Sequence, residues 1–403
     1  MDNKKNGIPK LRFPGFTGAW EQRKLGEVAT FSKGTGYSKQ DLENDGTPII
    51  LYGRMYTNYE LVIHSVNTFT TAKEKSIYSN GGEVIVPASG ETAEDISVAS
   101  VVEQANVLLG GDLNIIHTNK NVEPVFLALS ITNGEPHKDM AKRAQGKSVV
   151  HLHNSDLAQI KLSYPSKDEQ KKIDSYFLKF DSLIALHQRK LEHLQEQKKG
   201  LLQKMFPKNG EVVPEVRFPG FTDAWEQRKL GEVTEINPSS EIPDNFEYVD
   251  LESVVGTEMI AYRRENKETA PSRAQRLAKK GDIFYQTVRP YQKNNYHFNL
   301  MRKDFVFSTG YAQLRPNING DFLFVYIQLN NFVNEVLNRS TGTSYPAISP
   351  SNLMKIKIAI PTNSEQEKIG KFFKQLDSLI TLHQRKLEHL ELMKKGLLQQ
   401  MFV

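Results

Sequence analysis

Residues 165–206 read PSKDEQKKIDSYFLKFDSLIALHQRKLEHLQEQKKGLLQKMF, and residues 361–402 read PTNSEQEKIGKFFKQLDSLITLHQRKLEHLELMKKGLLQQMF. The two segments are identical at 27 of 42 positions. In both, apolar residues recur at alternating steps of four and three, which is the spacing of a coiled-coil seam. Each segment therefore predicts a long helix, and a helix of this kind needs a partner in water. We expect the two helices to pair with each other in antiparallel orientation.

The seam contains mostly large apolar side chains, with a few polar ones. The residues expected to pair the helices are Ile173, Phe177, Phe180, Ile184, Leu191, Leu194, Leu201, Ile369, Phe373, Leu376, Ile380, Leu387, Leu390 and Leu397. His187, Lys198, His383 and Lys394 occupy seam positions as well, and we interpret them as setting the register or extending their polar ends into water.

A second, shorter segment is also duplicated. Pro9–Val28 and Pro214–Val233 are identical at 17 of 20 positions. The segments between the repeats, 29–164 and 234–360, show no similarity beyond their ends. Identical frames around unrelated inserts indicate one scaffold that holds two different recognition surfaces. The alternative is a gene duplication whose middle part diverged freely.

These repeats predict a mixed α/β (α+β) fold with two globular domains separated by two long antiparallel coiled-coil helices, in a duplicated pseudo-twofold arrangement. The expected parts are an N-terminal domain (1–164, with short module 9–28 and variable part 29–164), a helix (165–206), a C-terminal domain (207–360, with short module 214–233 and variable part 234–360) and a second helix (361–403).

Composition excludes several classes of protein. The chain has 403 residues, 38% of them apolar and 25% charged, with a net charge of +5 and no cysteine. The lack of cysteine excludes disulfides, thiolate zinc sites and iron–sulfur clusters. No apolar run is long enough to span a membrane, and no secretory signal is recognisable, so we expect a cytoplasmic protein.

No complete active site is recognisable, and no catalytic or metal-binding residue is assigned. A Gly-x4-Gly-Lys-Ser/Thr phosphate loop is absent, as is an Asn/Asp-Pro-Pro-aromatic methyltransferase motif. His151 and His153 alternate as on a surface strand, without the carboxylates of a metal site. Asp244, Glu265 and Lys267 resemble a nuclease pattern only loosely, and we interpret this spacing as chance.

Charge is distributed unevenly between the variable segments. Residues 261–293 contain nine basic and three acidic side chains, whereas 29–164 contain 11 basic and 15 acidic ones. Basic side chains neutralise phosphates, and Arg, Gln and Asn bond to purine edges. The candidate DNA-contacting residues are Lys33, Lys39, Arg54, Ser89, Lys142, Arg143, Lys147, Arg263, Arg264, Arg273, Arg276, Lys279, Lys280, Gln286, Arg289, Tyr291, Gln292, Lys293 and Tyr345. A solvated charged face is the alternative interpretation.

Three motifs carry a resemblance to a known family. They are Trp-Glu-x-x-Lys-Leu-Gly-Glu-Val at Trp20 and Trp225, Pro-x3-Glu-Gln-x2-Ile at Pro165 and Pro361, and Gly281-Asp282-Ile283-Phe284 followed by Val288-Arg289-Pro290-Tyr291. Together they make the chain similar to the specificity subunit of bacterial type I restriction-modification systems, over essentially its whole length. The first variable segment has the matching sequence at residues 82–90 but lacks the arginine.

The resemblance implies that each variable segment is a target recognition domain for one half of a split double-stranded DNA site. It implies that the helices set the unread spacer and dock two modification subunits, which bring S-adenosylmethionine. Two restriction subunits would add ATP- and magnesium-dependent translocation and cleavage, so this chain itself is expected to be non-catalytic and to bind no cofactor. The alternatives are a coiled-coil interaction scaffold that does not bind DNA and, less favoured, a stand-alone nuclease.

Overall fold

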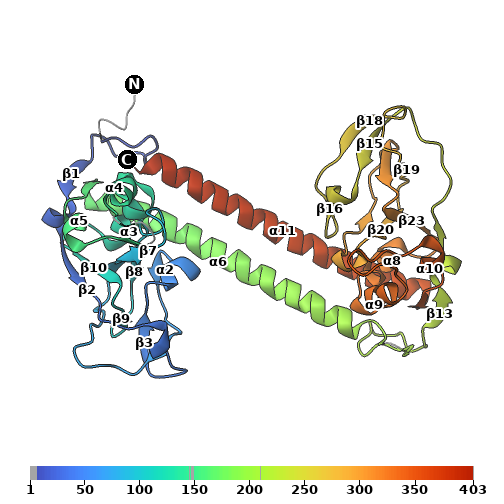
Figure 1. Cartoon of the computed structure of the whole chain (residues 1–403), viewed down its shortest axis with the longest axis horizontal. Helices are drawn as coiled ribbons and strands as arrows, with labels where there is room; N and C mark the ends of the chain where they lie inside the picture. Colours follow the sequence, from blue (N-terminus) through green and yellow to red (C-terminus); the bar gives the residue numbers. More distant parts are fainter. Residues whose placement is uncertain (1–6, 145, 147–148, 209, 403) are drawn as a thin grey trace. The chain divides into compact units, whose positions relative to one another are not determined.

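The computed structural model describes residues 7–144, 146, 149–208 and 210–402. The chain divides into two compact units, one formed by 1–187 together with 386–403 and the other by 188–385. Each unit combines strands, short helices and parts of two long helices (Figure 1). The expected mixed α/β class is confirmed. Within the described part of the chain, no helix has both the length and the apolar character needed to span a bilayer.

The first unit is built around a five-stranded sheet of order β2-β10-β6-β8-β4, in which β4 and β8 are parallel and the other pairs antiparallel. A three-stranded sheet, β5-β3-β9, and the pairs β1-β12 and β7-β11 complete its strands. The strands are β1 (Glu21–Lys24), β2 (Ala29–Lys33), β3 (Thr47–Ile50), β4 (Val62–Ile63), β5 (Phe69–Thr70), β6 (Glu83–Pro87), β7 (Ser89–Gly90), β8 (Ser100–Val102), β9 (Leu108–Leu109), β10 (Leu113–Thr118), β11 (Val150–His151) and β12 (Lys161–Tyr164).

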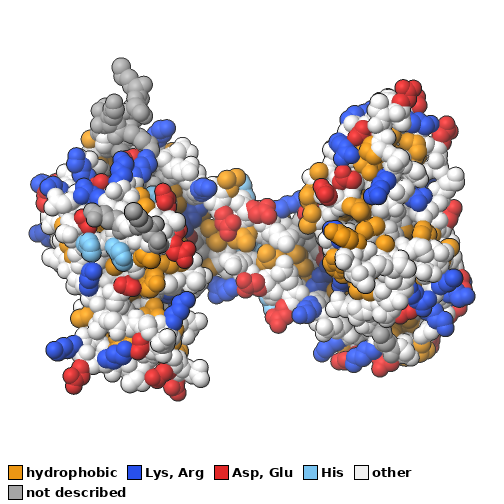
Figure 2. Space-filling model, viewed as in Figure 1, with side chains coloured by type: hydrophobic (Ala, Val, Ile, Leu, Met, Phe, Trp, Pro, Cys, Tyr) orange, Lys and Arg blue, Asp and Glu red, His pale blue; other side chains and the backbone are white. Residues whose placement is uncertain are grey.

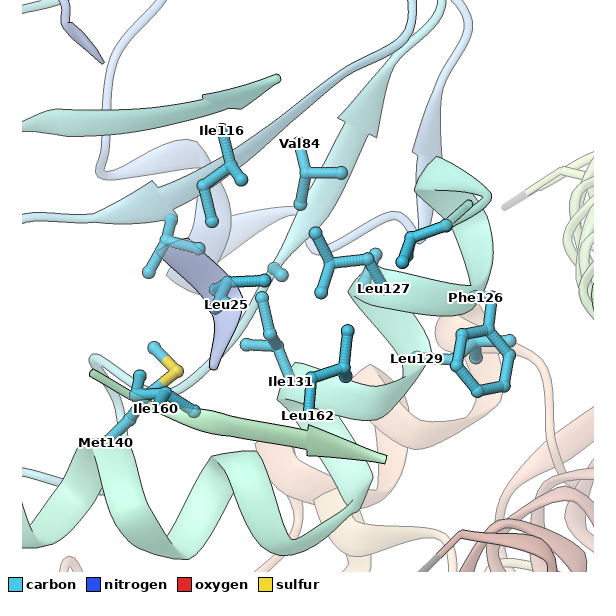
Figure 3. Packing of buried hydrophobic residues seen from close by; sticks show 14 of the residues in the cluster. Leu25, Val84, Ile116, Phe126, Leu127, Leu129, Ile131, Met140, Ile160 and Leu162 are labelled. Carbon is cyan, nitrogen blue, oxygen red and sulfur yellow. The ribbon is translucent and has the colours of Figure 1, made fainter. Parts of the chain in front are cut away.

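Short helices complete the first unit, and most of them contribute residues to its buried core. They are α1 (Leu25–Val28), the 3-10 helix η2 (Lys39–Asp41), α2 (Arg54–Thr57), α3 (Pro124–Asn133), α4 (Glu135–Arg143) and α5 (Asn154–Ala158). α3 is apolar over most of its surface and turns Leu127 and Ile131 toward Val84 and Ile116 of the sheet (Figure 3). A helix that is apolar all round has to be buried, and α3 lies in the centre of this core.

The second unit contains two four-stranded sheets, of order β14-β23-β20-β21 and β18-β15-β22-β19, and the pairs β13-β24 and β16-β17. Its strands are β13 (Glu226–Lys229), β14 (Thr234–Ile236), β15 (Asn245–Val249), β16 (Val254–Val255), β17 (Glu258–Met259), β18 (Arg263–Asn266), β19 (Ala274–Leu277), β20 (Ile283–Gln286), β21 (Tyr296–His297), β22 (Phe305–Ser308), β23 (Tyr311–Pro316) and β24 (Lys357–Ile360). Its short helices are α7 (Leu230–Val233), η3 (Leu251–Ser253), η4 (Pro290–Gln292), α8 (Gly320–Tyr326), α9 (Asn330–Asn338) and α10 (Pro350–Met354).

The two duplicated segments form the long helices α6 (Lys167–Lys204) and α11 (Asn363–Met401). In the first unit, the C-terminal end of α11 lies beside the start of α6, and the ring of Phe402 packs 6.2 Å from that of Phe177 (Figure 1). In the second unit, Phe206 packs 6.0 Å from Phe373 in the same way. Every residue expected at an apolar seam position is buried or half-buried. The antiparallel pairing is therefore present in each unit.

The polar seam residues Lys198 and Lys394 form ion pairs with the opposite helix. Lys394 pairs with Asp181 in the first unit, and Lys198 pairs with Asp377 at 2.5 Å in the second. Asp181 and Asp377 occupy the same position of the repeat, so the two contacts are equivalent. Each ion pair forms only when the two helices are aligned in this register, which agrees with a role of the lysines in setting it.

Each long helix begins with a buried Glu-Gln pair that ties together three parts of its unit. In the first unit, Glu169 accepts two hydrogen bonds from Arg12 of the short module, at 2.6 and 2.7 Å. Gln170 accepts from the backbone N–H of Glu123, directly before α3, and donates to the Pro165 carbonyl. A carboxylate this deeply buried requires such a partner, so the helix start and the short module have to fold together.

The second unit repeats these contacts. Glu365 accepts from Arg217 at 2.8 and 2.7 Å, and Gln366 accepts from the backbone N–H of Asn319, before α8. Even the junction between long helix and short module is repeated. Leu11 N–H donates to the carbonyl of Gln400 at 3.1 Å, as Val216 N–H does to that of Lys204 at 2.9 Å.

The two units differ at one buried position, where helix α8 or α3 meets the long helix. In the second unit, the Asn319 side chain caps α8 by accepting from Phe322 N–H at 2.9 Å. A Cβ on Gly370 would lie only 2.8 Å from that side-chain oxygen. In the first unit, the equivalent residues are Glu123, whose side chain does not cap α3, and Asp174. Asp174 thus brings a carboxyl group from the long helix to the uncapped start of α3.

Burial and, to a smaller extent, the negative charge of Glu123 raise the pKa of Asp174 to about 8, although the backbone N–H of Phe126 opposes both effects. The folded state thus binds a proton that the unfolded chain releases near pH 4. Stability contributed by this proton is present below about pH 4 and is lost as the pH rises through about 8.

We therefore expect Asp174→Asn to leave stability at pH 4.5 nearly unchanged and to raise it at pH 8.5 by about 2–4 kcal/mol. Chemical denaturation of the full chain across this pH range measures the difference. Asp168→Asn, at an exposed position of the same helix, is the matched control and should follow the parent profile. Parallel profiles for Asp174→Asn and the parent would contradict the assignment.

Candidate nucleic-acid interface

The loop between β20 and β21 in the second unit has an unusual backbone conformation. Arg289 and Lys293 both adopt left-handed backbone conformations, with φ of 54° and 57°. Between them, Pro290 begins the single turn η4. Non-glycine residues in this conformation cost free energy and persist where the surroundings enforce them, commonly at functional sites.

Buried amide side chains enforce the loop conformation. Asn295 accepts from the backbone N–H of Gln286 at 2.7 Å, and Gln286 donates to Gln292 at 2.9 Å. Lys293 donates to the Gln328 carbonyl at 2.8 Å and to Asn330 at 2.7 Å. Burial lowers the pKa of Lys293, and the charge of Lys198 lowers it further.

Two of the candidate residues are therefore structural. The expectation that Gln286 contacts DNA is wrong for this geometry, because its side chain is 2% exposed and its amide is used within the loop. Lys293 likewise directs its ammonium group to oxygens of its own unit. The sequence does not show which of these side chains are buried, because Gln and Asn occur at both exposed and buried positions of this loop.

Arg289 differs from its neighbours in what its side chain contacts. Its guanidinium lies 4.3 Å from the ring centroid of Tyr345, in a cation–π contact. The backbone N–H of Arg289 donates to the Pro346 carbonyl at 2.8 Å, which joins this loop to residues 340–346. Among the described residues, no hydrogen bond or ion pair of this guanidinium is found. Tyr291 and Tyr345 are exposed beside it, by 49% and 63%.

The basic excess of residues 261–293 is smaller at the surface than the sequence indicates. Arg263 pairs with Asp250 and Glu265, both at 2.7 Å, and Arg264 pairs with Glu247 at 3.3 Å. Basic and acidic groups alternate over the part of the second unit where β15 and β18 lie (Figure 2). The prediction that Arg263 and Arg264 serve phosphates is therefore weakened, because adjacent carboxylates pair with them, including Glu247 and Asp250 from outside the 261–293 window.

Other basic candidates remain accessible. Arg273, Lys279 and Lys280 are exposed, and Gln292 is exposed next to Tyr291. Arg276 is half-buried, and burial lowers its pKa. The loose nuclease pattern is not assembled, since Glu265 is committed to Arg263, and the described residues contain no cluster of acidic and histidine side chains that could hold a metal ion.

The first unit has a different side chain at the place of Arg289. Val84 on β6 pairs with Ile116 on β10, and Ile283 on β20 pairs in the same way with Leu314 on β23. Gly90 lies six residues after Val84, and Arg289 lies six residues after Ile283, so these two residues occupy equivalent positions. A Cβ on Gly90 would meet the Tyr56 hydroxyl at 3.0 Å, and this hydroxyl donates to the Ser89 carbonyl. The place of Tyr345 is taken by Val149.

Ser89 was expected to contact DNA, but it is 6% exposed within the β7-β11 pair, so this geometry does not fit a contact. The remaining candidates of the first unit are scattered. Lys33, Lys39 and Lys142 are exposed, whereas Arg54 pairs with Glu60 at 2.5 Å and Arg143 with Asp139 at 3.2 Å. Lys147 lies outside the described residues.

Residue-type inspection missed the exposed tyrosines of the first unit. Tyr52, Tyr56 and Tyr59 are 38–41% exposed, and the rings of Tyr52 and Tyr56 contact each other at 6.1 Å. The hydroxyl end of Tyr59 donates to the Ala99 carbonyl at 3.2 Å, and burial of this end raises its pKa to about 12 although part of the residue is exposed. The signal that could have found them is the Tyr-x3-Tyr-x2-Tyr spacing at the start of an insert whose basic residues are few.

Comparison with known proteins agrees with this architecture. The family model for the type I restriction modification DNA specificity domain matches residues 18–196 and 222–392. The chain is 23% identical to the type I restriction enzyme MjaVIII specificity subunit of Methanocaldococcus jannaschii, over 94% of this chain and 91% of that protein. It is 24% identical to the HindI specificity subunit of Haemophilus influenzae, over 44% and 41%.

Solved structures share the fold. The S subunit of a type I restriction-modification system from M. genitalium superimposes with a TM-score of 0.65 at 15% identity, covering 98% of this chain and 99% of that one. A chain from a structural study of assembly and conformational transition in the type I R-M system gives 0.51 at 18% identity, covering 98% and 99%. With one match in each half of its sequence, the chain belongs to the type I restriction modification DNA specificity domain family.

Proposed function

We propose that this chain is the DNA specificity subunit of a type I restriction-modification complex, and that each recognition domain reads one half of a bipartite target. The observation that carries this proposal is the duplicated frame with unlike side chains at one equivalent site. Arg289 and Tyr345 stand in the second unit where Gly90 and Val149 stand in the first. Different groups at matched positions suit the reading of two different base sequences.

Affinity would come from charges that are not already neutralised within the protein. Arg273, Lys279 and Lys280 are exposed in the second unit, and Lys33, Lys39 and Lys142 in the first. Such side chains neutralise phosphates independently of sequence, and their contribution falls steeply with salt. Binding to DNA should therefore weaken with ionic strength, while an interaction scaffold for apolar protein surfaces would not respond in this way.

The chain is the non-catalytic member of the complex and assembles with other subunits. We propose two modification subunits, which supply S-adenosylmethionine, and two restriction subunits, which supply ATP- and magnesium-dependent activity, with no cofactor on this chain. The long helices offer matched docking positions for two copies of one partner. Leu183 and Leu186 on α6, and Leu379 and Leu382 at the same repeat positions on α11, are 40–46% exposed.

Independent reading by the two domains is tested by exchange. We expect that replacing residues 29–164 with the same segment of another specificity subunit changes one half of the methylated sequence and preserves the other, because the frame residues 9–28 and 165–206 remain. Methylome sequencing of cells that carry the variant and its partner subunits measures both halves. A control exchange of 234–360 should change the opposite half, and joint changes in both halves would contradict the proposal.

The helices are proposed to set the unread spacer, since α6 and α11 each contribute residues to both units. A seven-residue insertion at the same repeat position in both helices, after Gln188 and after Gln384, keeps the seam and adds about 10 Å. The preferred spacer should then grow by up to about three base pairs, with both half-sites unchanged. The readout is the same methylome measurement.

A two-residue insertion at the same positions is the control, because it turns the apolar seam away from its partner and should impair assembly. An active protein with seven-residue insertions and an unchanged spacer would show that another element sets the distance.

A further inference from the structure

We propose that Arg289 reads a guanine in the half-site of the second recognition domain. This inference rests on the DNA-specificity function proposed above and assigns a base to one residue of that domain. Three features support it: the restraint of the Arg289 loop, the guanidinium that is unpaired within the described residues, and the different residue at the equivalent position of the first unit.

The loop that carries Arg289 is held at both ends and in its middle. Arg289 N–H bonds to the Pro346 carbonyl at 2.8 Å, and Asn294 accepts from Gly256 N–H at 2.8 Å. Gln286 and Asn295 are 2% and 1% exposed and form hydrogen bonds on the buried side of the loop. These contacts hold Arg289 and Lys293 in the left-handed backbone conformation. Such a loop presents its side chain in one direction, which base reading requires and phosphate binding does not.

The guanidinium is oriented but not neutralised. The guanidinium carbon lies 4.3 Å from the Tyr345 ring centroid, so the ring contacts one side of the group in a cation–π interaction and leaves its N–H groups unused. The contrast within the same domain is Arg263, whose N–H groups bind Asp250 and Glu265. Of these two arginines, Arg289 is the one whose guanidinium has no hydrogen bond to a carboxylate within the described residues.

An oriented guanidinium edge matches guanine better than the other bases. Guanine presents two acceptors, N7 and O6, side by side in the major groove, and arginine binds both at once. Adenine offers one acceptor beside a donor at the same place, so it would leave one N–H of the pair unmatched. The structure therefore favours guanine as the base opposite Arg289.

The first recognition domain has no arginine at the equivalent position and cannot make this guanine contact. Its equivalent residue is Gly90, which has no side chain, and a Cβ there would lie in tight contact with the Tyr56 hydroxyl, at 3.0 Å. Val149 replaces the stacking ring. The guanine contact is accordingly a property of one half-site only.

The test measures binding of the complex, assembled with its modification subunits, to duplexes that carry each of the four base pairs at every position of the target. For Arg289→Ala, we expect discrimination at a single guanine of the second half-site to fall by roughly 10- to 100-fold. The preferences of the first half-site should persist, which shows that the variant is folded and assembled. Tyr345→Phe should retain the discrimination, and Tyr345→Val, the residue found in the first unit, should reduce it.

Lys280→Ala is the matched control for a phosphate contact and should weaken binding to all sequences equally, with a smaller salt dependence. The same uniform loss in Arg289→Ala would overturn the proposal. Unchanged preferences among the four base pairs at every position of the second half-site would overturn it as well. A parent complex without any sequence preference would instead refute the specificity function itself, so the two failures are distinguishable.

Discussion

A buried glutamate at the start of each long helix is the contact on which the rest of this structure depends. Glu169 and Glu365 are each 1% exposed, and each is neutralised by an arginine of the short module, Arg12 or Arg217. An unpaired carboxylate at such a site would cost several kcal/mol. The short module, the helix start and the loop before α3 or α8 are therefore assembled as one frame, because the neighbouring glutamine binds that loop.

The frame allows the inserts to differ. An aromatic contact also joins the end of a long helix to the short module of each unit. Phe402 packs on Trp20 in the first unit, and Phe206 packs on Trp225 in the second. Both clusters are provided by repeated residues, whereas the sheets are built from unrelated sequences and differ beyond a shared three-strand order, β2-β10-β6 in the first unit and β14-β23-β20 in the second. The contacts that join the helix starts to the short modules are thus made by duplicated residues, and the loops at the strand ends are free to carry different chemistry. A specificity subunit needs this separation.

The buried carboxyl of Asp174 shows how the frame itself accommodates change. The first unit supplies a carboxyl group to the start of α3 from the long helix, and the second supplies the cap of α8 from Asn319 and keeps a glycine opposite it. Either pair of residues fills the same space, but an exchange of one member alone would leave a collision or an uncapped helix. The effects of substitutions at these two positions on stability are therefore coupled and not additive.

Periodicity and repetition in the sequence determined the helices, their seam, their mutual pairing within each unit and the duplicated organisation. These features follow from local spacing, which reports directly on which residues share a helix face. The motif residues Glu169, Gln170 and Arg12 were visible as repeats, but their contact joins positions 157 residues apart and depends on the tertiary structure. The reading surface was even less accessible, because charge in a sequence window does not show which groups neutralise each other. Arg263, Arg264 and Arg289 look alike in the sequence. Only the fold places carboxylates from 247 and 250 beside the first two and an aromatic ring beneath the third.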